Sequence, residues 1–460
     1  MRVLFLAVNF LKIPYPVYPL GANTAAALAA AAGHEVKFVD LLSDSGFSDY
    51  QPERVKELVR DFEPDCVGLS LRNLESADST NSDDYWSLGL VSRLVADIRS
   101  VSSAPQVLGG AGFSLMPETV LKYSGADYGL AGEGENILPA FLQALSQGRP
   151  PRGLWATAEP GAAQKSAYDP ELLRAYDRAG GLIGVQTKRG CPLGCNYCSY
   201  PLLEGRRVRL RPGGEILADL KFLAKILAEP HIAFADAVFN DPAGEWRELL
   251  EAMLAAGLKI RWTAFFQPSD LSRADLDLIK ASGVSGLEFG TDGASDAALK
   301  GMNKPFEFAL VRALQARCLA AGVPAAHYFI FGGPGETEDS LEEGIENIRS
   351  LEGCASFISS GLSIYPRTPL HRLALREGVL SPDDDLGRPV FYFSPQIEPE
   401  KMNARLEEAF GRSRHILFPP GRALERTEAL RRMGFKGILW DTLIKSPAVC
   451  RAPGAAARHA

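Results

Sequence analysis

Residues 191–198 read Cys-Pro-Leu-Gly-Cys-Asn-Tyr-Cys, which places three cysteines within eight positions. Thiolates bind soft iron and zinc ions. A structural zinc site normally has four protein ligands, and no fourth cysteine or histidine lies near this stretch. Three thiolates on a short loop can instead hold three corners of a [4Fe–4S] cluster and leave the fourth iron open. We therefore predict that Cys191, Cys195 and Cys198 are metal ligands, with zinc binding or burial in the core as the alternatives.

The remaining four cysteines stand alone, and an isolated cysteine is commonly a small buried hydrophobe. Seven cysteines in 460 residues are too few, and odd in number, for a disulfide scaffold. The chain is 46% hydrophobic and 23% charged, which excludes a disordered or fibrous protein. Its net charge of −7 disfavours nucleic acid as a partner. The lone cysteines are Cys66, Cys318, Cys354 and Cys450.

The longest apolar stretches are too short to form a transmembrane segment, which needs about 18 apolar residues. The N-terminus also lacks the small-residue cleavage site of a secretory signal. We therefore expect a cytoplasmic protein.

The cysteine stretch follows the first strand of a repeating strand–helix pattern. Six such repeats predict a partial (β/α)6 barrel over residues 182–369, with its active face at the carboxyl ends of the strands. The candidate strands are 182–189, 231–236, 260–266, 286–290, 326–332 and 357–365. The candidate helices are 214–228, 243–256, 272–282, 307–321 and 337–350.

The N-terminal region repeats the same alternation. Residues 1–146 contain five continuous apolar strands separated by helices, which predicts a doubly wound, flavodoxin-like α/β domain with a parallel sheet. Residues 147–181 are rich in Pro, Gly and Ala and are predicted to be a linker, and residues 370–460 a small C-terminal cap. The candidate strands are 3–9, 35–40, 66–72, 106–113 and 127–132; the helices are 21–32, 52–62, 84–100, 116–123 and 136–146.

Doubly wound sheets bind ligands beyond the carboxyl ends of their strands. Four unusual loops occupy that position, three of them rich in glycine or polar residues, and glycine lets a backbone approach a ligand closely. Tight strand-to-helix turning is the alternative explanation for the glycines. The loops are Lys12–Leu20, Ser70–Asn73, Gly109–Phe113 and Gly132–Glu135.

With its Cys-x-x-x-Cys-x-aromatic-Cys stretch after a first barrel strand, the chain resembles the radical S-adenosylmethionine (SAM) enzymes. The N-terminal domain resembles the cobalamin-binding domain fused to one branch of that superfamily, so that the resemblance covers about residues 1–370. Further matching segments are Gly286–Asp292, Met302–Lys304, Phe331–Thr337 and Ile364–Thr368.

The resemblance implies three cofactors: a [4Fe–4S] cluster, SAM and cobalamin. The open iron would chelate SAM, and an electron from a donor such as flavodoxin or ferredoxin would release a 5′-deoxyadenosyl radical. The leading hypothesis is methylation of an unactivated carbon of a small-molecule, lipid or natural-product substrate through methylcobalamin. The alternatives are a cyclase, oxidase or rearrangement enzyme without net methyl transfer, and a non-catalytic cobalamin sensor or carrier. The sequence does not identify the substrate, the electron donor or the oligomeric state.

The resemblance also assigns residues to cobalamin. The common Asp-x-His-x-x-Gly motif is missing, and His34 precedes a strand at the wrong end of the sheet. We therefore expect base-off cobalamin without a histidine ligand, and we place Arg72 below the cobalt in a catalytic role. A salt bridge from Arg72 to Glu75 or Asp78 is the alternative. The predicted cobalamin-binding residues are Asn9, Ser70, Arg72, Asn73, Gly109, Gly110, Gly112, Phe113, Glu133 and Gly134.

The expected SAM contacts lie at the carboxyl ends of the barrel strands. The family's Gly-Gly-Glu segment is replaced by residues 235–241, in which Asp236 could bind the SAM amino group. The predicted SAM-binding residues are Tyr197, Asp236, Glu288, Asp292, Gly332 and Gly333. We expect the substrate to contact the 370–460 region, with Tyr365 in a catalytic role and His371 and His415 as further candidates.

Overall fold

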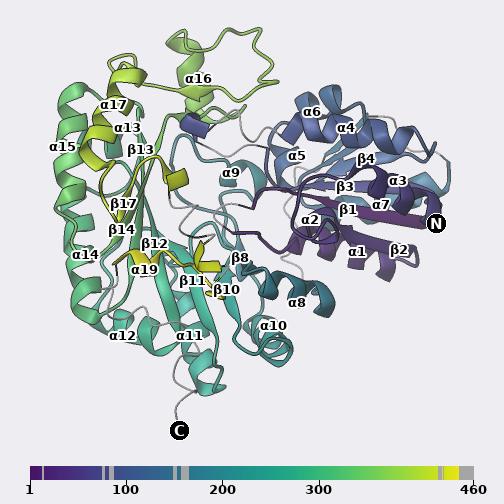
Figure 1. Cartoon of the computed structure of the whole chain (residues 1–460), viewed down its shortest axis with the longest axis horizontal. Coiled ribbons are helices and arrows are strands. Elements are labelled where there is room, and N and C mark those ends of the chain that lie inside the picture. Colours follow the sequence, from purple (N-terminus) through teal and green to yellow (C-terminus); the bar gives the residue numbers. More distant parts are fainter. Residues whose placement is uncertain are drawn as a thin grey trace.

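The computed structural model describes the chain in several stretches. Glu75 and Cys450, both named in the sequence analysis, lie outside them. The described residues are 1–12, 15–74, 78–81, 87–148, 153–156, 165–422, 427, 429–431 and 433–444. They form two α/β units that lie side by side, with helix α9 between them (Figure 1).

The first unit is a parallel sheet in the order β2-β1-β3-β4-β5-β6. Helices α1 and α7 pack on one face, and α3, α4 and α6 on the other, so the apolar strands are buried on both sides. The predicted flavodoxin-like, doubly wound fold is confirmed. The strands are β1 Arg2–Val8, β2 Glu35–Asp40, β3 Cys66–Leu71, β4 Gln106–Gly109, β5 Tyr128–Ala131 and β6 Gly153–Ala156. The helical segments are α1 Leu20–Ala31, α2 Leu41–Asp44, α3 Pro52–Phe62, η1 Ser79–Asn81, α4 Ser87–Arg99, α5 Ala111–Leu115, α6 Pro117–Ser124 and α7 Gly134–Ser146.

Two details differ from the sequence prediction. The strand expected at 106–113 ends at Gly109, because Gly110 adopts φ 96° and starts the turn into α5. The expected linker 147–181 contains β6 and helix α8, Pro170–Arg178. Since β6 pairs with β5 along its whole length, the first sheet extends beyond residue 146.

The second unit is an open barrel whose parallel strands follow the order β17-β14-β13-β12-β11-β10-β7. All six predicted strands are present, and β17 adds a seventh from the C-terminal region. The strands are β7 Ile183–Val185, β10 His231–Phe234, β11 Arg261–Phe266, β12 Val284–Asp292, β13 Ala325–Phe331, β14 Ala355–Ser360 and β17 Ile416–Leu417, and a hairpin joins β8 Lys188–Arg189 to β9 Arg209–Leu210. The helices are α9 Tyr200–Leu203, α10 Gly213–Ile226, α11 Glu245–Ala255, α12 Arg273–Ala281, α13 Asp296–Gly301, α14 Phe308–Ala321 and α15 Glu338–Arg349.

The C-terminal region is spread over both units instead of forming one cap. Helix α16, Pro369–Arg376, packs into the core of the first unit, and α17, Pro399–Phe410, packs on α15. The short strands β15, Leu362–Ser363, and β16, Phe391–Tyr392, pair with each other. The remaining helical segments are η2 Pro420–Arg422 and α19 Asp441–Ile444.

The segment before α19 enters the barrel. Ile438 and Trp440 are buried against Ala326 and Ala355, and a side chain at Gly286 would collide with the Trp440 ring. The C-terminal region therefore fills part of the barrel interior, which mixed sequence periodicity could not reveal.

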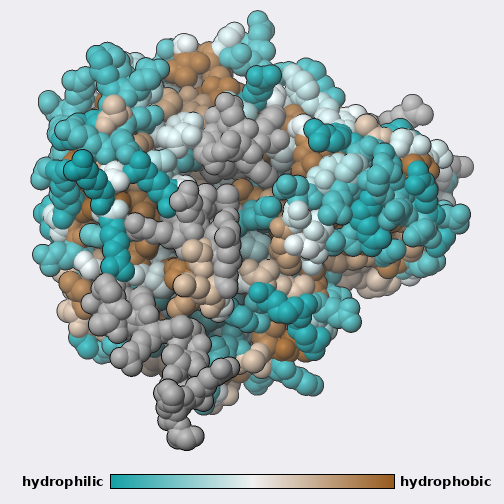
Figure 2. Space-filling view, in the orientation of Figure 1, coloured by the Kyte–Doolittle hydropathy of each residue, from teal (hydrophilic) through white to brown (hydrophobic). Residues whose placement is uncertain are grey.

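The visible outer surfaces of both units are mainly hydrophilic (Figure 2). Among the described residues, no helix is both long and apolar enough to cross a membrane.

Candidate functional site

The cysteine loop is held in place by polar contacts along its length. The Asn196 side chain donates to the Gly301 carbonyl oxygen at 2.7 Å, and the Asn303 side chain donates to the Gly194 carbonyl oxygen at 2.6 Å. The Cys191 amide donates to the Gly205 carbonyl oxygen at 3.1 Å. The end of α13 and the segment after α9 therefore fix the loop between β8 and α9.

The three cysteines lie close enough for their charges to interact. Burial, followed by the neighbouring Cys195 and Cys191, raises the pKa of Cys198 to about 12. Within the described stretches, no group of three His, Cys, Asp or Glu side chains is arranged to hold a single metal ion. A [4Fe–4S] cluster needs one thiolate per iron, and the loop offers three cysteines that interact with one another.

An ion pair between Asp292 and Lys304 lies beside Tyr197 of the cysteine loop. Asp292 ends β12 in a left-handed conformation at φ 62°, pairs with Lys304 and accepts a hydrogen bond from the Tyr197 hydroxyl. Burial disfavours the Lys304 charge, but Asp292, Cys195 and Cys198 outweigh it and raise the pKa of Lys304. The Asp292 carboxylate can accept hydrogen bonds from an ammonium group, and the Lys304 cation can pair with a carboxylate. Together they can bind the amino-acid part of a ligand at the cluster.

Arg72 directly follows β3 at the carboxyl end of that strand and is exposed. Desolvation by the surrounding protein raises the pKa of Tyr200 even though its side chain is 40% exposed, and the nearby Arg72 charge opposes that rise. Because Tyr200 follows Cys198 by two positions, the cation lies between the first sheet and the cysteine loop. The Asn73 Oδ1 atom beside it is buried without a hydrogen-bond partner in the described structure, which suits a ligand with amide groups such as cobalamin.

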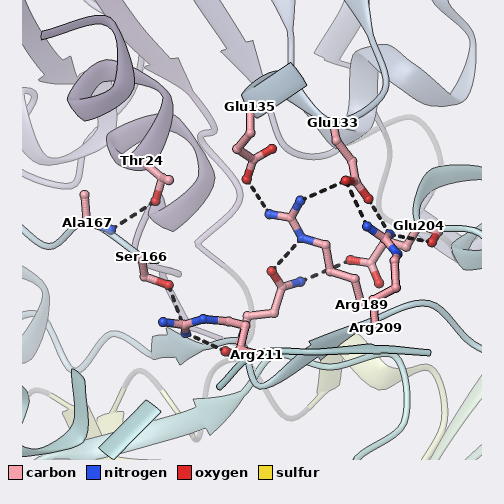
Figure 3. Close-up of polar contacts among 10 residues, drawn as sticks. Thr24, Glu133, Glu135, Ser166, Ala167, Arg189, Glu204, Arg209 and Arg211 are labelled. Atoms are coloured by element: carbon pink, nitrogen blue, oxygen red, sulfur yellow. Dashed lines mark hydrogen bonds and ion pairs between the residues drawn. The ribbon is translucent and has the colours of Figure 1, made fainter. Parts of the chain in front are cut away.

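An ion-pair network joins the loop after β5 to the strands that flank the cysteine loop (Figure 3). Glu133 contacts both Arg209 and Arg189, and Glu135 pairs with Arg189 at 2.5 Å. These side chains are at most 15% exposed, so water screens their charges only weakly. The network connects the rim of the first sheet to the base of the cysteine loop.

The two units match two known protein families. Residues 6–142 match the B12 binding domain, and residues 185–348 match the radical SAM superfamily. The chain is a cobalamin-binding radical SAM protein. This confirms the predicted family, enzyme class and cofactor set of [4Fe–4S] cluster, SAM and cobalamin.

Known proteins resemble this radical SAM chain along most of its length. A tryptophan 2-C-methyltransferase of Streptomyces laurentii is 22% identical, over 78% of this chain and 72% of that protein. A cytidylyl-2-hydroxyethylphosphonate methyltransferase of Streptomyces wedmorensis is 23% identical, over 82% and 81%. The structure of the radical SAM methyltransferase TsrM from Kitasatospora setae, with tryptophan and a SAM analogue bound, has a TM-score of 0.83 at 22% identity, covering 96% of this chain and 97% of that one.

Several predicted cobalamin contacts in this radical SAM protein serve packing instead. A side chain at Gly110 would collide with the Leu71 carbonyl, and one at Gly112 would come within 3.2 Å of the Arg72 backbone. Phe113 is fully buried against Gly129, so its side chain packs inside the first unit. Glu133 is engaged by the arginines of the network. The positions that remain at the rim are Asn9, Ser70, Arg72, Asn73, Gly109 and Gly134.

The first predicted loop also differs. Val17 forms a bridge with Leu182, and the Tyr18 amide donates to the Leu182 carbonyl at 2.9 Å, so this loop joins the two units. Residues 13 and 14 lie outside the described stretches.

The predicted SAM contacts divide into two groups. Asp292 and Tyr197 lie at the cysteine loop, as expected for that role. Asp236 is buried and receives hydrogen bonds from the Thr187 amide and hydroxyl, so its predicted binding of the SAM amino group is not supported. The Gly332 and Gly333 amides both donate to the Glu336 carboxyl, at 2.5 and 3.0 Å, and are thus already occupied.

Glu288, the other carboxylate predicted to contact the adenosyl group, has a different setting from Asp292. It lies four residues before Asp292 on β12, inside the barrel and away from the cysteine loop, and is 2% exposed. The Trp440 indole donates to its carboxyl oxygen at 3.1 Å.

The predicted substrate residues are not brought together. Tyr365 lines a small pocket at the boundary between Leu74 and Met116 of the first unit and the segment around Arg388. His371 lies in α16. The His415 carbonyl oxygen accepts a hydrogen bond from the Ser356 amide near the start of β14, at the opposite end of the barrel from the cysteine loop.

Sequence reasoning missed three contributors to the site: Lys304, Arg189 and Tyr15. Lys304 stood in the quoted Met302–Lys304 segment, and Arg189 stands two positions before Cys191, so both had a local signal. Tyr15 stood in the predicted rim loop Lys12–Leu20, but nothing in the sequence indicated that it lies near Glu288 of the barrel.

Replacing Glu133 by glutamine should weaken the association of the two units. The loss of this carboxylate leaves Arg209 and Arg189 buried with fewer partners, and breaking such a pair costs about 3 kcal/mol. Urea unfolding followed by intrinsic fluorescence should show an earlier transition. As a control, Glu57→Gln removes an exposed carboxylate 3.7 Å from Arg54 and should change stability by less than about 0.5 kcal/mol. Equal effects of the two substitutions would contradict a stabilising role for the network.

Proposed function

We propose that this protein is a cobalamin-dependent radical SAM methyltransferase that transfers a methyl group to a carbon atom of a small molecule. The observation that carries the proposal is that the carboxyl edge of the B12-binding domain, where Arg72 follows β3, meets the cysteine loop: helix α5 at that edge contacts helix α9, which follows Cys198. A cofactor on that edge and a cluster on that loop would face one site. Direct transfer between two cofactors requires such proximity.

The relatives support methyl transfer in particular. Two of them are named as methyltransferases of small molecules, one acting on tryptophan and one on cytidylyl-2-hydroxyethylphosphonate. The alignment covers more than two thirds of the length of each relative. Because this chain is under 25% identical to them, its own substrate is proposed only as a small molecule.

The chain's residues have distinct tasks in this proposal. Cys191, Cys195 and Cys198 hold the cluster, while Asp292 and Lys304 receive the charged groups of SAM. Arg72 places a cation at the cobalamin site, and the Glu133 network fixes the spacing between the two units. When bound, the cofactors supply radical and methyl-transfer chemistry. A flavodoxin or ferredoxin in the cytoplasm is the proposed electron donor, because the cluster needs a low-potential reductant.

The proposal can be tested without knowing the substrate. Reconstituted enzyme is reduced and given SAM with a trideuterated methyl group, and cobalamin is then extracted for mass spectrometry. We expect labelled methyl on cobalamin, and labelled methyl on a small molecule when a deproteinised cell extract is added. Formation of 5′-deoxyadenosine with no label in either fraction would contradict methyl transfer and favour the cyclase or rearrangement alternative. A sample with unlabelled SAM serves as the control.

A further inference from the structure

We propose that Glu288 and the aromatic rings beside it form a substrate subsite that binds an ammonium group carried on a flat, apolar body. This inference rests on the proposed function, because it names the substrate class of the same barrel. It begins from a buried carboxyl group that the cofactors leave unexplained.

Glu288 is surrounded by neutral donors. The Trp440 indole donates to its carboxyl oxygen at 3.1 Å, and the Tyr328 and Thr263 hydroxyls lie near enough to lower its pKa. The Thr263 hydroxyl also lies 2.8 Å from the Gly286 carbonyl oxygen and has only one hydrogen to donate. Trp440 is therefore the firm partner, and a carboxylate with room for about four hydrogen bonds retains acceptor capacity.

Within the part of the chain that the structure describes, no cation acts on the charge of Glu288. Burial raises the pKa of Glu288 to about 7, and the opposing effects come from the three neutral donors. A buried carboxylate without a cationic partner is costly. An ammonium group from a ligand would supply the missing charge and hold the carboxyl group in its ionised form.

Aromatic rings stand beside the carboxyl group. On β11, Phe265 shares the inner face with Thr263 and is 43% exposed, although its strand neighbours Trp262 and Phe266 are buried in the core. The Phe265 and Tyr328 rings are 5.4 Å apart, and the Tyr328 and Phe357 rings stack at 5.0 Å. An exposed ring inside a barrel is a ready contact for a flat apolar ligand, and ring faces also attract cations.

Two segments from outside the barrel bound this subsite. Trp440 from the C-terminal region lies on one side of Glu288. Tyr15 from the loop after β1 is half-buried, and the charges of both Glu288 and Arg72 act on its hydroxyl. Since Arg72 marks the cobalamin edge, a ligand anchored on Glu288 would extend toward the cofactors.

Matched pairs of small probes test the inference. Tryptamine and 2-phenylethylamine carry an ammonium group, and tryptophol and 2-phenylethanol carry a hydroxyl on the same frames. Binding to the enzyme reconstituted with cluster and cobalamin is measured by saturation-transfer NMR titration at pH 8. We expect each amine to bind about tenfold more tightly than its alcohol, a typical effect for one partly desolvated ion pair.

The Glu288→Gln variant should lose that preference, so that the amine-to-alcohol affinity ratio falls to about one. Glutamine still accepts from Trp440, and its amide can donate to the Tyr328 or Thr263 hydroxyl, so the fold should persist. The control Glu251→Gln alters an exposed carboxylate on α11 and should keep the full ratio.

A pH series on the unaltered enzyme gives a second readout. Both probe amines stay protonated between pH 6 and 8, since alkyl amines titrate near about 10. The Glu288 carboxyl ionises as pH rises through about 7, so the amine preference should grow over this range. The titratable groups facing it, Tyr328 and Tyr15, have pKa values raised far above this window by burial, and Arg72 and Arg431 near Tyr15 keep their charge throughout.

Three results would overturn the inference: equal affinity for amines and alcohols, a preference that survives Glu288→Gln, or no binding of either amine up to about 10 mM. The labelled-methyl experiment on cobalamin needs no amine. The proposed function and this substrate class can therefore fail independently.

Discussion

Replacing Cys195 by alanine should abolish both the iron–sulfur cluster and the cleavage of SAM. The unaltered chain should bind about four irons per molecule after anaerobic reconstitution and absorb broadly near about 400 nm. Cys195 is buried at the centre of the loop. Its two neighbours in sequence are held by hydrogen bonds, Gly194 to Asn303 and Asn196 to Gly301. With two thiolates left, the loop offers too few ligands to retain a cube with an open fourth iron.

Iron and sulfide content, together with the yield of 5′-deoxyadenosine, measure this effect. The matched control is Cys318→Ala, which removes a buried sulfur from α14 in the barrel core. That variant should keep the cluster, because its cost is confined to packing, about 1–2 kcal/mol for a small cavity. Full iron content in a variant that lacks all three loop cysteines would refute the assignment.

Local patterns determined what the sequence could predict. Continuous apolar strands alternating with helices revealed both parallel sheets, because strands buried on two faces leave a strong signal. The spacing of Cys191, Cys195 and Cys198 identified the cluster loop for a similar reason: the ligands are neighbours in sequence. Asp292 was predicted to contact SAM because it ends a strand whose carboxyl end lies on the active face; it lies beside that loop, and its contact with SAM stays a prediction.

Other features depend on contacts between distant segments. The strand that holds both Asp292 and Glu288 gives no sign that Trp440, more than a hundred residues later, covers Glu288 from within the barrel. Glycines at a sheet edge suggested a ligand, yet Gly110 and Gly112 make room for the backbone of β3. Glu133 was assigned to cobalamin because its arginine partners lie on another unit. Such roles are set by tertiary packing, which periodicity does not encode.

Arg72 is the residue whose loss should most alter the cobalamin chemistry. In the rim segments 9–20, 70–74, 109–116 and 132–135 the sequence contains no histidine, and His34 stands just before β2, at the opposite edge of the sheet. Cobalamin bound at this rim should therefore be base-off without a nitrogen ligand from the protein. Its Co(II) form should give an electron paramagnetic resonance spectrum that lacks nitrogen superhyperfine splitting, and a clear three-line splitting would contradict this coordination.

A guanidinium group near the cobalt cannot ligate it, but its charge favours the more reduced states of the cofactor. Arg72→Ala should consequently shift the Co(II)/Co(I) midpoint to a more negative potential and slow methylation of cobalamin by SAM at least about tenfold, within the range seen when one electrostatic contact is removed. Because Arg72 is exposed at a loop, the substitution should cost under about 1 kcal/mol of stability. Arg60→Ala, an exposed arginine at the end of α3, is the matched control and should change neither quantity. If potential and methylation rate stay the same in Arg72→Ala, the cation acts only in joining the two units, and a shift in thermal unfolding without a shift in potential would identify that structural role.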